Sequence, residues 1–292
     1  MVASRNFGGA RNLALALVGA LVAFALLAQT ARAADAPLRY VALGDSYSAA
    51  SGVLPPDPLA PPQCLRSLRN YPHAIAGATG ARLRDVTCGA AETGDFFEPQ
   101  YPGVAPQLDA LGRRTQLVTM TIGGNDSGVF IGTLRACGEA GLLALGQGSP
   151  CRDRYGSSFE DTIRTTTYPA LVRSLKAVRK RAPRARVAIL GYPWIMPPTG
   201  GCFEKMPVAE GDVPYVRGIQ ATLNDAVRRA AAATYVNFNL VSEGHDACQP
   251  IGERWIEPVL QTTNPVVVHP NALGEAAMAA QTMKVLRLSP RS

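Results

Sequence analysis

The sequence predicts an α/β protein in which helices cover both faces of a parallel sheet. Short segments rich in β-branched and aromatic residues alternate with longer segments of helical periodicity, and this alternation is typical of a parallel sheet covered by helices. The composition agrees, since 292 residues with 47% hydrophobic and 17% charged content suit one α/β domain or two small ones. Five segments have strand character: 38–43, 82–88, 116–122, 186–190 and 236–241.

Helical segments lie between or after several of these strands. The segment 168–183 places Leu171, Leu175 and Val178 on one face at spacings of three and four. Pro183 follows the basic last turn of this segment as a stop signal. Two further segments share the periodicity and are also expected to be helices: 213–235 and 271–288.

Three long connections are rich in proline, glycine and serine: 52–63, 126–158 and 193–213. Each lies between a strand and the next helix, so none is typical of an interdomain linker. The sequence has no internal repeat, heptad pattern or low-complexity tail. We therefore expect a single domain over residues 34–292.

The N-terminal segment has the layout of a secretory signal peptide. Arg5 and Arg11 precede an apolar run over 13–28, and residues 31–33 form a small-x-small cleavage site. The apolar run is short for a membrane span, and no second long apolar run follows. We therefore expect residues 1–33 to be removed and the mature protein to be secreted.

The charge of the chain is mild. The formal net charge is +7, and it falls by three, to +4, when the three arginines of the N-terminal segment are removed. Such a charge permits attraction to anionic surfaces. No basic run interleaves with aromatic residues, however, so nucleic-acid binding is not indicated.

Polar and glycine-rich residues follow the predicted strands at their carboxyl ends. Ser46 follows the first strand, Gly89 the second and Asn125 the third, while His269 lies in a loop beyond the fifth. The carboxyl ends of parallel strands share one edge of the sheet, where α/β proteins bind ligands. A serine needs a neighbouring base to become nucleophilic, and its tetrahedral intermediate needs preorganised donors. These residues are therefore the parts of a serine acyl hydrolase.

Four short motifs resemble those of the SGNH, or GDSL-type, hydrolases and occur in the family's order: "GDSYS" at 44–48, "CGAAET" at 88–93, "GGND" at 123–126 and "HPNALG" at 269–274. The resemblance covers most of the mature chain, and the glycine motif, the six cysteines and the N-terminal segment are similar to the secreted actinobacterial esterase/lipase branch. It implies a three-layer α/β/α fold with a mainly parallel, flavodoxin-like five-stranded sheet. No Gly-x-Ser-x-Gly elbow occurs, which disfavours an α/β-hydrolase fold.

The resemblance also implies a role for each motif residue. Ser46 would be the nucleophile and His269 the general base. The N–H groups of Ser46 and Gly89, with the side-chain amide of Asn125, would form the oxyanion hole. Of the other two histidines, His73 is interpreted as a structural residue at a helix start, and His245 is the alternative base.

The sequence departs from the family pattern at Val266. Many members carry an aspartate at this position, three residues before the histidine, and a valine side chain cannot orient an imidazole. Some members of the secreted branch use a backbone carbonyl instead. We therefore expect the carbonyl of Val266, or a neighbouring one within 264–267, to accept a hydrogen bond from Nδ1 of His269. Asp126 and Asp246 are the alternative carboxylate partners.

The six cysteines lie in the mature part of the chain, and an even count in an exported protein indicates disulfides. No Cys-x-x-Cys pair occurs, which disfavours a zinc or redox site. Pairing between near neighbours in the predicted layout is geometrically easiest, and the resemblance to the secreted branch implies the same three bonds: Cys64–Cys88, Cys137–Cys151 and Cys202–Cys248.

The expected function is that of a secreted carboxylic-ester hydrolase, an esterase or lipase with possible phospholipase A activity, that acts on lipid-like or aryl acyl esters. No metal or organic cofactor is implied. The apolar stretch 136–146 would line an acyl groove, or would be a loop packed by its own leucines. Transient contact with a lipid surface and a monomeric state are also expected. The alternatives are a polysaccharide O-acetyl esterase with the same machinery and a secreted binding protein without catalysis.

Overall fold

The computed structural model describes residues 1, 36–230 and 233–291. The expected signal peptide therefore lies outside the described residues except for Met1. The chain from Arg39 onward forms one compact unit, distinct from the segment 1–38. Within the described ranges, no helix has both the length and the apolar content that a membrane crossing requires.

Five parallel strands form one sheet in the order β2-β1-β3-β4-β5. This is the flavodoxin-like order, in which the chain moves outward from β1 first to one side and then to the other. The inner strands β3 and β4 are almost entirely buried, as expected for a sheet covered on both faces. The strands are β1 (Arg39–Ala42), β2 (Arg82–Asp85), β3 (Leu117–Met120), β4 (Arg186–Leu190) and β5 (Thr234–Val236).

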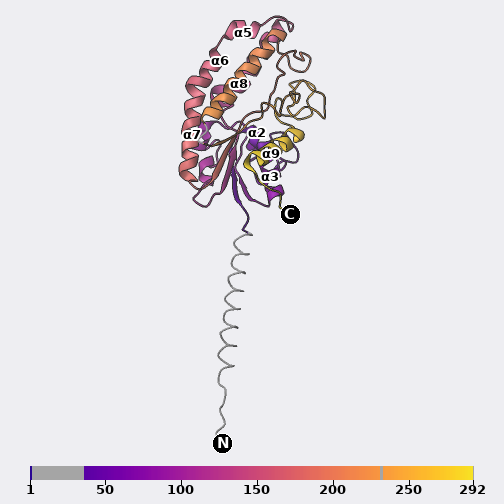
Figure 1. The fold of residues 1–292 in the computed structure, drawn as a ribbon. Coiled ribbons are helices and arrows are strands. Elements are labelled where there is room, and N and C mark those ends of the chain that lie inside the picture. The colour runs from indigo at the N-terminus through magenta and orange to yellow at the C-terminus, as the bar shows by residue number, and fades with distance from the viewer. Residues whose placement is uncertain (2–35, 231–232, 292) are drawn as a thin grey trace. The chain divides into compact units, whose positions relative to one another are not determined.

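Helices lie on both sides of the sheet and complete three layers. The helices α3 (Tyr71–Thr79) and α9 (Ala272–Leu286) pack together on one side, and α7 (Tyr168–Arg181) and α8 (Val213–Ala230) pack together on the other (Figure 1). Shorter elements lie in the connections: α2 (Ser46–Ala49), α5 (Pro150–Tyr155), α6 (Ser158–Thr162), the π-helical turn η5 (Ile163–Thr167), and the 3₁₀ turns η1 (Pro62–Cys64), η2 (Thr93–Phe96), η3 (Gln107–Ala110), η4 (Asp126–Gly128) and η6 (Glu210–Asp212).

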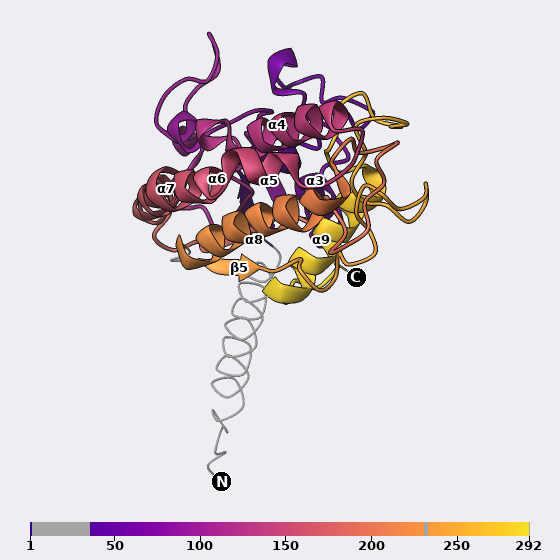
Figure 2. The ribbon, with the colours of Figure 1, turned by 90° about the horizontal axis from the view of Figure 1, so that it is seen from above.

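The predicted connection 126–158 is corrected by the structure, because it contains the long helix α4 (Val129–Leu143) as well as α5. Seen from above, α4 lies beside α5 and α8, on which it packs (Figure 2). One of the glycines that made this segment resemble a loop, Gly141, serves close packing instead. A Cβ atom at Gly141 would lie 2.4 Å from the carbonyl oxygen of Pro207, so only glycine fits there.

The fifth strand is shorter than predicted and begins earlier, at Thr234 instead of residue 236. The chain turns away at Asn237, whose side-chain oxygen accepts the N–H of Asn239 at 2.8 Å. Such a side-chain turn competes with strand pairing. Phe238 is nevertheless fully buried and enters the core from a turn rather than from a strand, whereas Leu240 and Val241 are exposed.

Three disulfides join Cys64 to Cys88, Cys137 to Cys151 and Cys202 to Cys248. The first joins the loop after β1 to the residues that follow β2. The second joins α4 to α5, and the third joins the connections that follow β4 and β5. All three therefore stabilise segments beyond the carboxyl ends of the strands, where the candidate functional residues also lie.

Candidate active site

Ser46 stands on the first tight turn after β1. Gly44 makes this turn with a φ of +125°, and a Cβ atom at this position would lie 2.4 Å from the carbonyl oxygen of Thr121. Asp45 then caps α2 by accepting the N–H of Tyr47 at 3.0 Å. Ser46 is therefore the first residue of a short helix, where a backbone N–H has no partner within the helix.

Asp45 holds this turn and does not contact the base. One of its carboxylate oxygens accepts the hydroxyl of Thr121 at 2.6 Å, and the other accepts the hydroxyl of Tyr192 at 2.5 Å. The N–H of Gly124 donates to the same Tyr192 oxygen at 3.0 Å. Burial raises the pKa of Asp45, and its hydrogen bonds lower it in part. Asp45 thus connects the serine turn to the glycine pair that follows β3.

The structure brings Ser46 and His269 together. Nε2 of His269 lies 2.7 Å from Oγ of Ser46, and both side chains line a pocket of about 220 Å³. Asn125, Ala90 and Ile131 line the same pocket. A histidine at this distance can accept the serine proton directly.

A backbone carbonyl faces the imidazole and comes from the predicted segment 264–267, where it belongs to Val267, the neighbour of Val266. The carbonyl oxygen of Val267 lies 2.7 Å from Nδ1 of His269. Val268 between them has a φ of +54°, and this left-handed turn brings the carbonyl two positions upstream back toward the ring. Val266 instead lines the pocket with its side chain.

The alternative carboxylate partners lie elsewhere. Asp126 accepts the N–H of Thr93 at 2.8 Å and its hydroxyl at 2.7 Å, and burial raises its pKa. Asp246 accepts the N–H of Cys248 at 2.9 Å. In the part of the chain that the structure describes, no carboxylate lies within hydrogen-bonding distance of His269.

The environment of His269 favours the neutral imidazole. Burial lowers the pKa of His269 below its usual value of 6.5, and the hydrogen bond to Val267 raises it in part. A base must be unprotonated before it accepts a proton, so the lowered pKa keeps His269 competent over a wider range of pH.

The predicted donor Gly89 lies at the pocket. Its N–H donates to the carbonyl oxygen of Cys64 at 2.8 Å and is therefore occupied. The next residue, Ala90, has a φ of +62°, lines the pocket, and has an N–H that donates to no residue the structure describes. The available donor of this loop is thus one residue further along the chain than predicted.

Asn125 lies at the pocket as predicted. One hydrogen of its amide is donated to the carbonyl oxygen of Ala91 at 3.1 Å, which leaves the second hydrogen for another acceptor. The same contact joins the loop after β3 to the loop after β2. This hydrogen bond therefore holds Asn125 close to the loop that carries Ala90.

The other two histidines lie in different surroundings. Nδ1 of His73 is 2.8 Å from the side-chain oxygen of Asn70, at the start of α3. His245 stacks on Trp255 with ring centroids 4.3 Å apart, and its Nδ1 is 2.6 Å from the carbonyl oxygen of Glu253. Neither histidine lines the Ser46 pocket.

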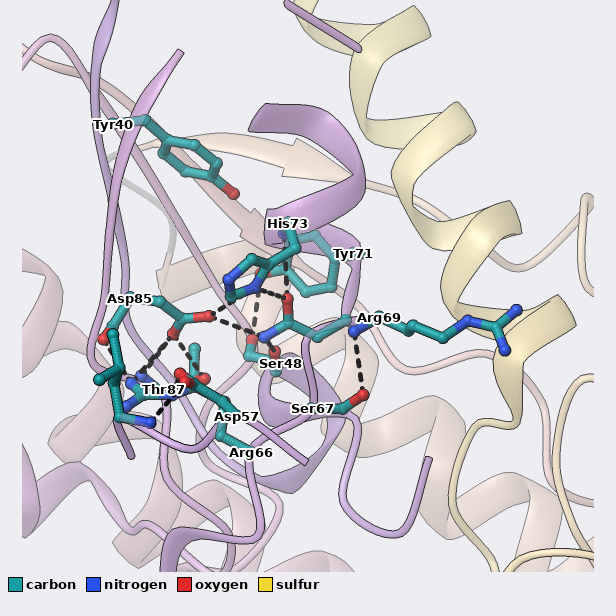
Figure 3. A network of polar contacts seen from close by, with 12 residues as sticks. Tyr40, Ser48, Asp57, Arg66, Ser67, Arg69, Tyr71, His73, Asp85 and Thr87 are labelled. Carbon is teal, nitrogen blue, oxygen red and sulfur yellow. Dashed lines mark hydrogen bonds and ion pairs between the residues drawn. The ribbon is translucent and has the colours of Figure 1, made fainter. Parts of the chain in front are cut away.

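A buried polar network anchors the serine helix to the sheet (Figure 3). Asp85, at the end of β2, accepts the side-chain amide of Asn70 at 2.8 Å and lies 3.5 Å from Arg66. Burial alone would raise the pKa of Asp85, but the hydrogen bond from His73 and the charge of Arg66 outweigh it and lower the pKa. Because Asn70 also donates to the carbonyl oxygen of Ser48 at 2.9 Å, α2 is fixed relative to β2.

Among the described residues, no group of three or more histidine, cysteine, aspartate or glutamate side chains is arranged to hold a metal ion. The site consists instead of a hydroxyl, an imidazole and amide donors at the carboxyl edge of a doubly wound sheet. This arrangement defines a serine hydrolase. The chain belongs to the GDSL-like lipase/acylhydrolase family, which it matches over residues 42–277.

Streptomyces proteins are similar over nearly the whole chain. The chain is 63% identical to Lipase 2 of Streptomyces coelicolor, over 94% of this chain and 95% of that protein. It is 29% identical to the crystal structure of phospholipase A1 from Streptomyces albidoflavus, with a TM-score of 0.70 over 86% of this chain and 99% of that one. It is also similar to the crystal structure of an extracellular lipase from Streptomyces rimosus, with 30% sequence identity and a TM-score of 0.69 over 86% of this chain and 99% of that one. The protein is therefore a carboxylic-ester hydrolase of the actinobacterial lipase branch.

Two residues of the site were missed in the sequence, Ala90 and Ile131, and a third, Val267, lies within the predicted segment 264–267 but was not singled out. Val267 was hidden because the i−2 carbonyl reaches the imidazole only through the left-handed turn at Val268, which a valine does not signal. Ala90 was hidden for the same reason, since its positive φ is typical of glycine. Ile131 was placed in a connection and not on α4, although its apolar neighbours on one helical face were a usable signal.

Proposed function

We propose that Ser46 is the nucleophile and His269 the general base of this ester hydrolase. The observation that carries the proposal is the 2.7 Å contact between Oγ of Ser46 and Nε2 of His269, with Nδ1 held by the carbonyl of Val267. As Oγ attacks the ester carbonyl carbon, its proton passes to Nε2. The imidazolium then protonates the leaving alcohol as the C–O bond breaks, which leaves an acyl ester on Ser46.

Deacylation repeats these steps with water. His269 takes a proton from the water, the hydroxide attacks the acyl carbon, and the proton returns to Oγ as the carboxylic acid leaves. Each tetrahedral intermediate carries a negative oxygen. The donors proposed for it are the N–H of Ser46, the N–H of Ala90 and the side-chain amide of Asn125, which line one pocket.

An apolar groove supports acyl chains of medium length or longer as substrates. It has a volume of about 310 Å³ and lies between α4 and the segment 206–208. Ile131 lines both this groove and the Ser46 pocket, while Val267 and Val268 form the groove wall next to His269. The groove therefore adjoins the site at Ile131, and an acyl chain would extend from Ser46 past Ile131 along α4.

We further propose that the enzyme is secreted and works at a lipid surface as a monomer. The three disulfides suit an oxidising compartment. Large apolar side chains are exposed near the groove, with Leu143 and Leu145 at the end of α4 exposed to 84% and 81%. Leu65 and Ile131, which line the Ser46 pocket, are exposed to 52% and 44%. These side chains would enter the acyl layer of a lipid surface.

Hydrolysis of p-nitrophenyl acetate, butyrate, octanoate and palmitate by the purified protein tests the proposed substrate class. We expect kcat/KM to rise from butyrate to octanoate, because burial of each methylene in the groove stabilises the transition state. Activity confined to p-nitrophenyl acetate would exclude acyl-chain recognition and favour an acetyl esterase. Sedimentation with anionic phospholipid vesicles, compared for the wild type and Leu143→Ser/Leu145→Ser, tests the surface contact.

A further inference from the structure

The residues beside Ser46 and His269 are themselves joined by a hydrogen bond. Tyr47 follows Ser46 on α2, and its hydroxyl donates to the carbonyl oxygen of Val268 at 2.7 Å, across 221 positions of the sequence. Val268 directly precedes His269. The nucleophile and the base are thus connected twice, once through their own side chains and once through Tyr47 and Val268.

The turn that Tyr47 holds has an unfavourable backbone conformation. Val268 has a φ of +54°, which a β-branched residue rarely adopts unless its surroundings enforce it. Glu257 holds this turn through its backbone, since its carbonyl accepts the N–H of Val268 and its N–H donates to the carbonyl of His269, both at 2.9 Å. The carbonyl of Val268 points the other way, to Tyr47.

The hydroxyl of Tyr47 supplies the partner that this carbonyl needs. Val268 is only 2% exposed, and a buried carbonyl without a partner is destabilising. Without the hydroxyl, the turn would relax out of the left-handed region and carry the carbonyl of Val267 away from Nδ1 of His269. Burial and the negative charge of Asp45 keep the pKa of Tyr47 well above its usual range, so the hydroxyl remains a donor.

The ring of Tyr47 is fixed as firmly as its hydroxyl. It lies 5.3 Å from the imidazole of His269, between ring centroids, and meets Tyr192 edge-on at 5.1 Å and Phe130 edge-on at 5.9 Å. Tyr47 is 2% exposed. The donor is therefore preorganised, because the buried ring packs against three other rings.

We propose that Tyr47 is a positioning residue for His269. By holding the Val268 turn it keeps the carbonyl of Val267 on Nδ1, which selects the tautomer with hydrogen on Nδ1 and leaves Nε2 to accept the proton of Ser46. The inference rests on the proposed roles of Ser46 and His269. It can be tested separately from those roles, because the tautomer of His269 is observable without any catalysis.

The test is Tyr47→Phe, which removes the hydroxyl and keeps the ring. Tyr40→Phe is the matched control, because Tyr40 is equally buried and loses one hydrogen bond, to Thr119 at 2.6 Å, within the sheet. We expect kcat of Tyr47→Phe to fall by roughly 10- to 100-fold with KM close to that of the wild type. Nitrogen-15 NMR of the His269 imidazole should show one tautomer, with hydrogen on Nδ1, in the wild type and Tyr40→Phe, and a mixture in Tyr47→Phe.

A single Nδ1–H tautomer in folded Tyr47→Phe would overturn the proposal, even if kcat fell, because the loss would then come from packing. Wild-type kcat in this variant would overturn it as well. Should Tyr47→Phe fail to fold, the wild type decides: a mixture of tautomers there contradicts the proposal, and a slowly exchanging Nδ1 proton supports it. Full activity of Ser46→Ala, measured in parallel, would instead refute the proposed roles of Ser46 and His269.

Discussion

The carbonyl oxygen of Val267 lies 2.7 Å from Nδ1 of His269 and takes the place that a carboxylate has in a serine triad. A carbonyl accepts the Nδ1 hydrogen and so fixes the tautomer. It carries no full charge to stabilise the imidazolium. We therefore propose a dyad with a backbone partner, and the following predictions depend on this difference.

Neither candidate carboxylate should behave as a triad member. In a serine triad, replacing the aspartate by asparagine lowers kcat by about 10⁴, because the imidazole adopts the wrong tautomer. We expect Asp126→Asn and Asp246→Asn to cause much smaller losses, since Asp126 accepts the N–H of Thr93 and Asp246 accepts the N–H of Cys248. Steady-state kinetics of the folded variants checks this. A loss of about 10⁴ in either one would show that a carboxylate acts on His269.

The side chain at position 266 should also matter little to catalysis. Val266→Ala keeps the backbone, and the accepting carbonyl belongs to Val267. We expect kcat on p-nitrophenyl butyrate to stay within about threefold of the wild type, a difference of less than one kcal/mol in the barrier. A much larger fall in kcat, with an unchanged melting temperature, would show that the valine side chain supports the imidazole.

The pH dependence should reflect the buried histidine. His269 must be neutral to act as a base, and burial lowers its pKa below 6.5. Activity is therefore present above this pKa and is lost as the pH falls through it, so the acid limb of kcat/KM should have its midpoint below pH 6.5. Initial rates in a constant-ionic-strength buffer series check this. A midpoint above 6.5 would mean that the charged imidazole is stabilised in the free enzyme.

Asn125→Ala should lower kcat by roughly 10² to 10³, the usual effect of removing one oxyanion donor. The variant also loses the hydrogen bond to the carbonyl of Ala91, so its melting temperature must be measured alongside. Asn125→Asp is a useful companion, because a carboxylate of similar shape cannot donate and would repel the oxyanion. A tenfold or smaller fall in kcat with intact folding would assign Asn125 to a structural role.

Ile131→Ala should change the chain-length preference. Ile131 lines both the site and the apolar groove, so its loss should lower kcat/KM for p-nitrophenyl octanoate by roughly 3- to 10-fold. Butyrate should be much less affected, because a short acyl chain does not pass this residue. Ile251→Ala is the matched control, since Ile251 is exposed but lines a different pocket. An equal loss on both esters would place the acyl chain elsewhere.

The sheet and the order of the catalytic motifs were predictable because they depend on local patterns. Strands β1, β3 and β4 stand within one or two residues of their predictions, as do the ends of α7 and α9. Helix α4 was missed, although the apolar residues on one of its faces were a usable signal. Its glycines lower helix propensity, and the need for one of them, Gly141, is visible only in the structure, where it meets the backbone of Pro207.

The candidate site was predictable in its side chains but not in its backbone. Ser46, Asn125 and His269 could be found because their chemistry depends on residue type, and they line one pocket in the structure. Val267 and Ala90 contribute a carbonyl and an N–H, which every residue type except proline carries. Their positions follow from left-handed turns at Val268 and Ala90, and these turns are imposed by tertiary contacts.

The most direct test of the central claim is covalent labelling of the nucleophile. A p-nitrophenyl alkylphosphonate reacts once with an activated serine and mimics the tetrahedral intermediate. Peptide mass mapping of the inactivated enzyme should place one phosphonyl group on Ser46, and p-nitrophenol should be released in equal amount to the protein. His269→Ala should react far more slowly, because the base that activates Ser46 is missing. A phosphonyl group on any other residue, or full inactivation with Ser46 unlabelled, would contradict the account.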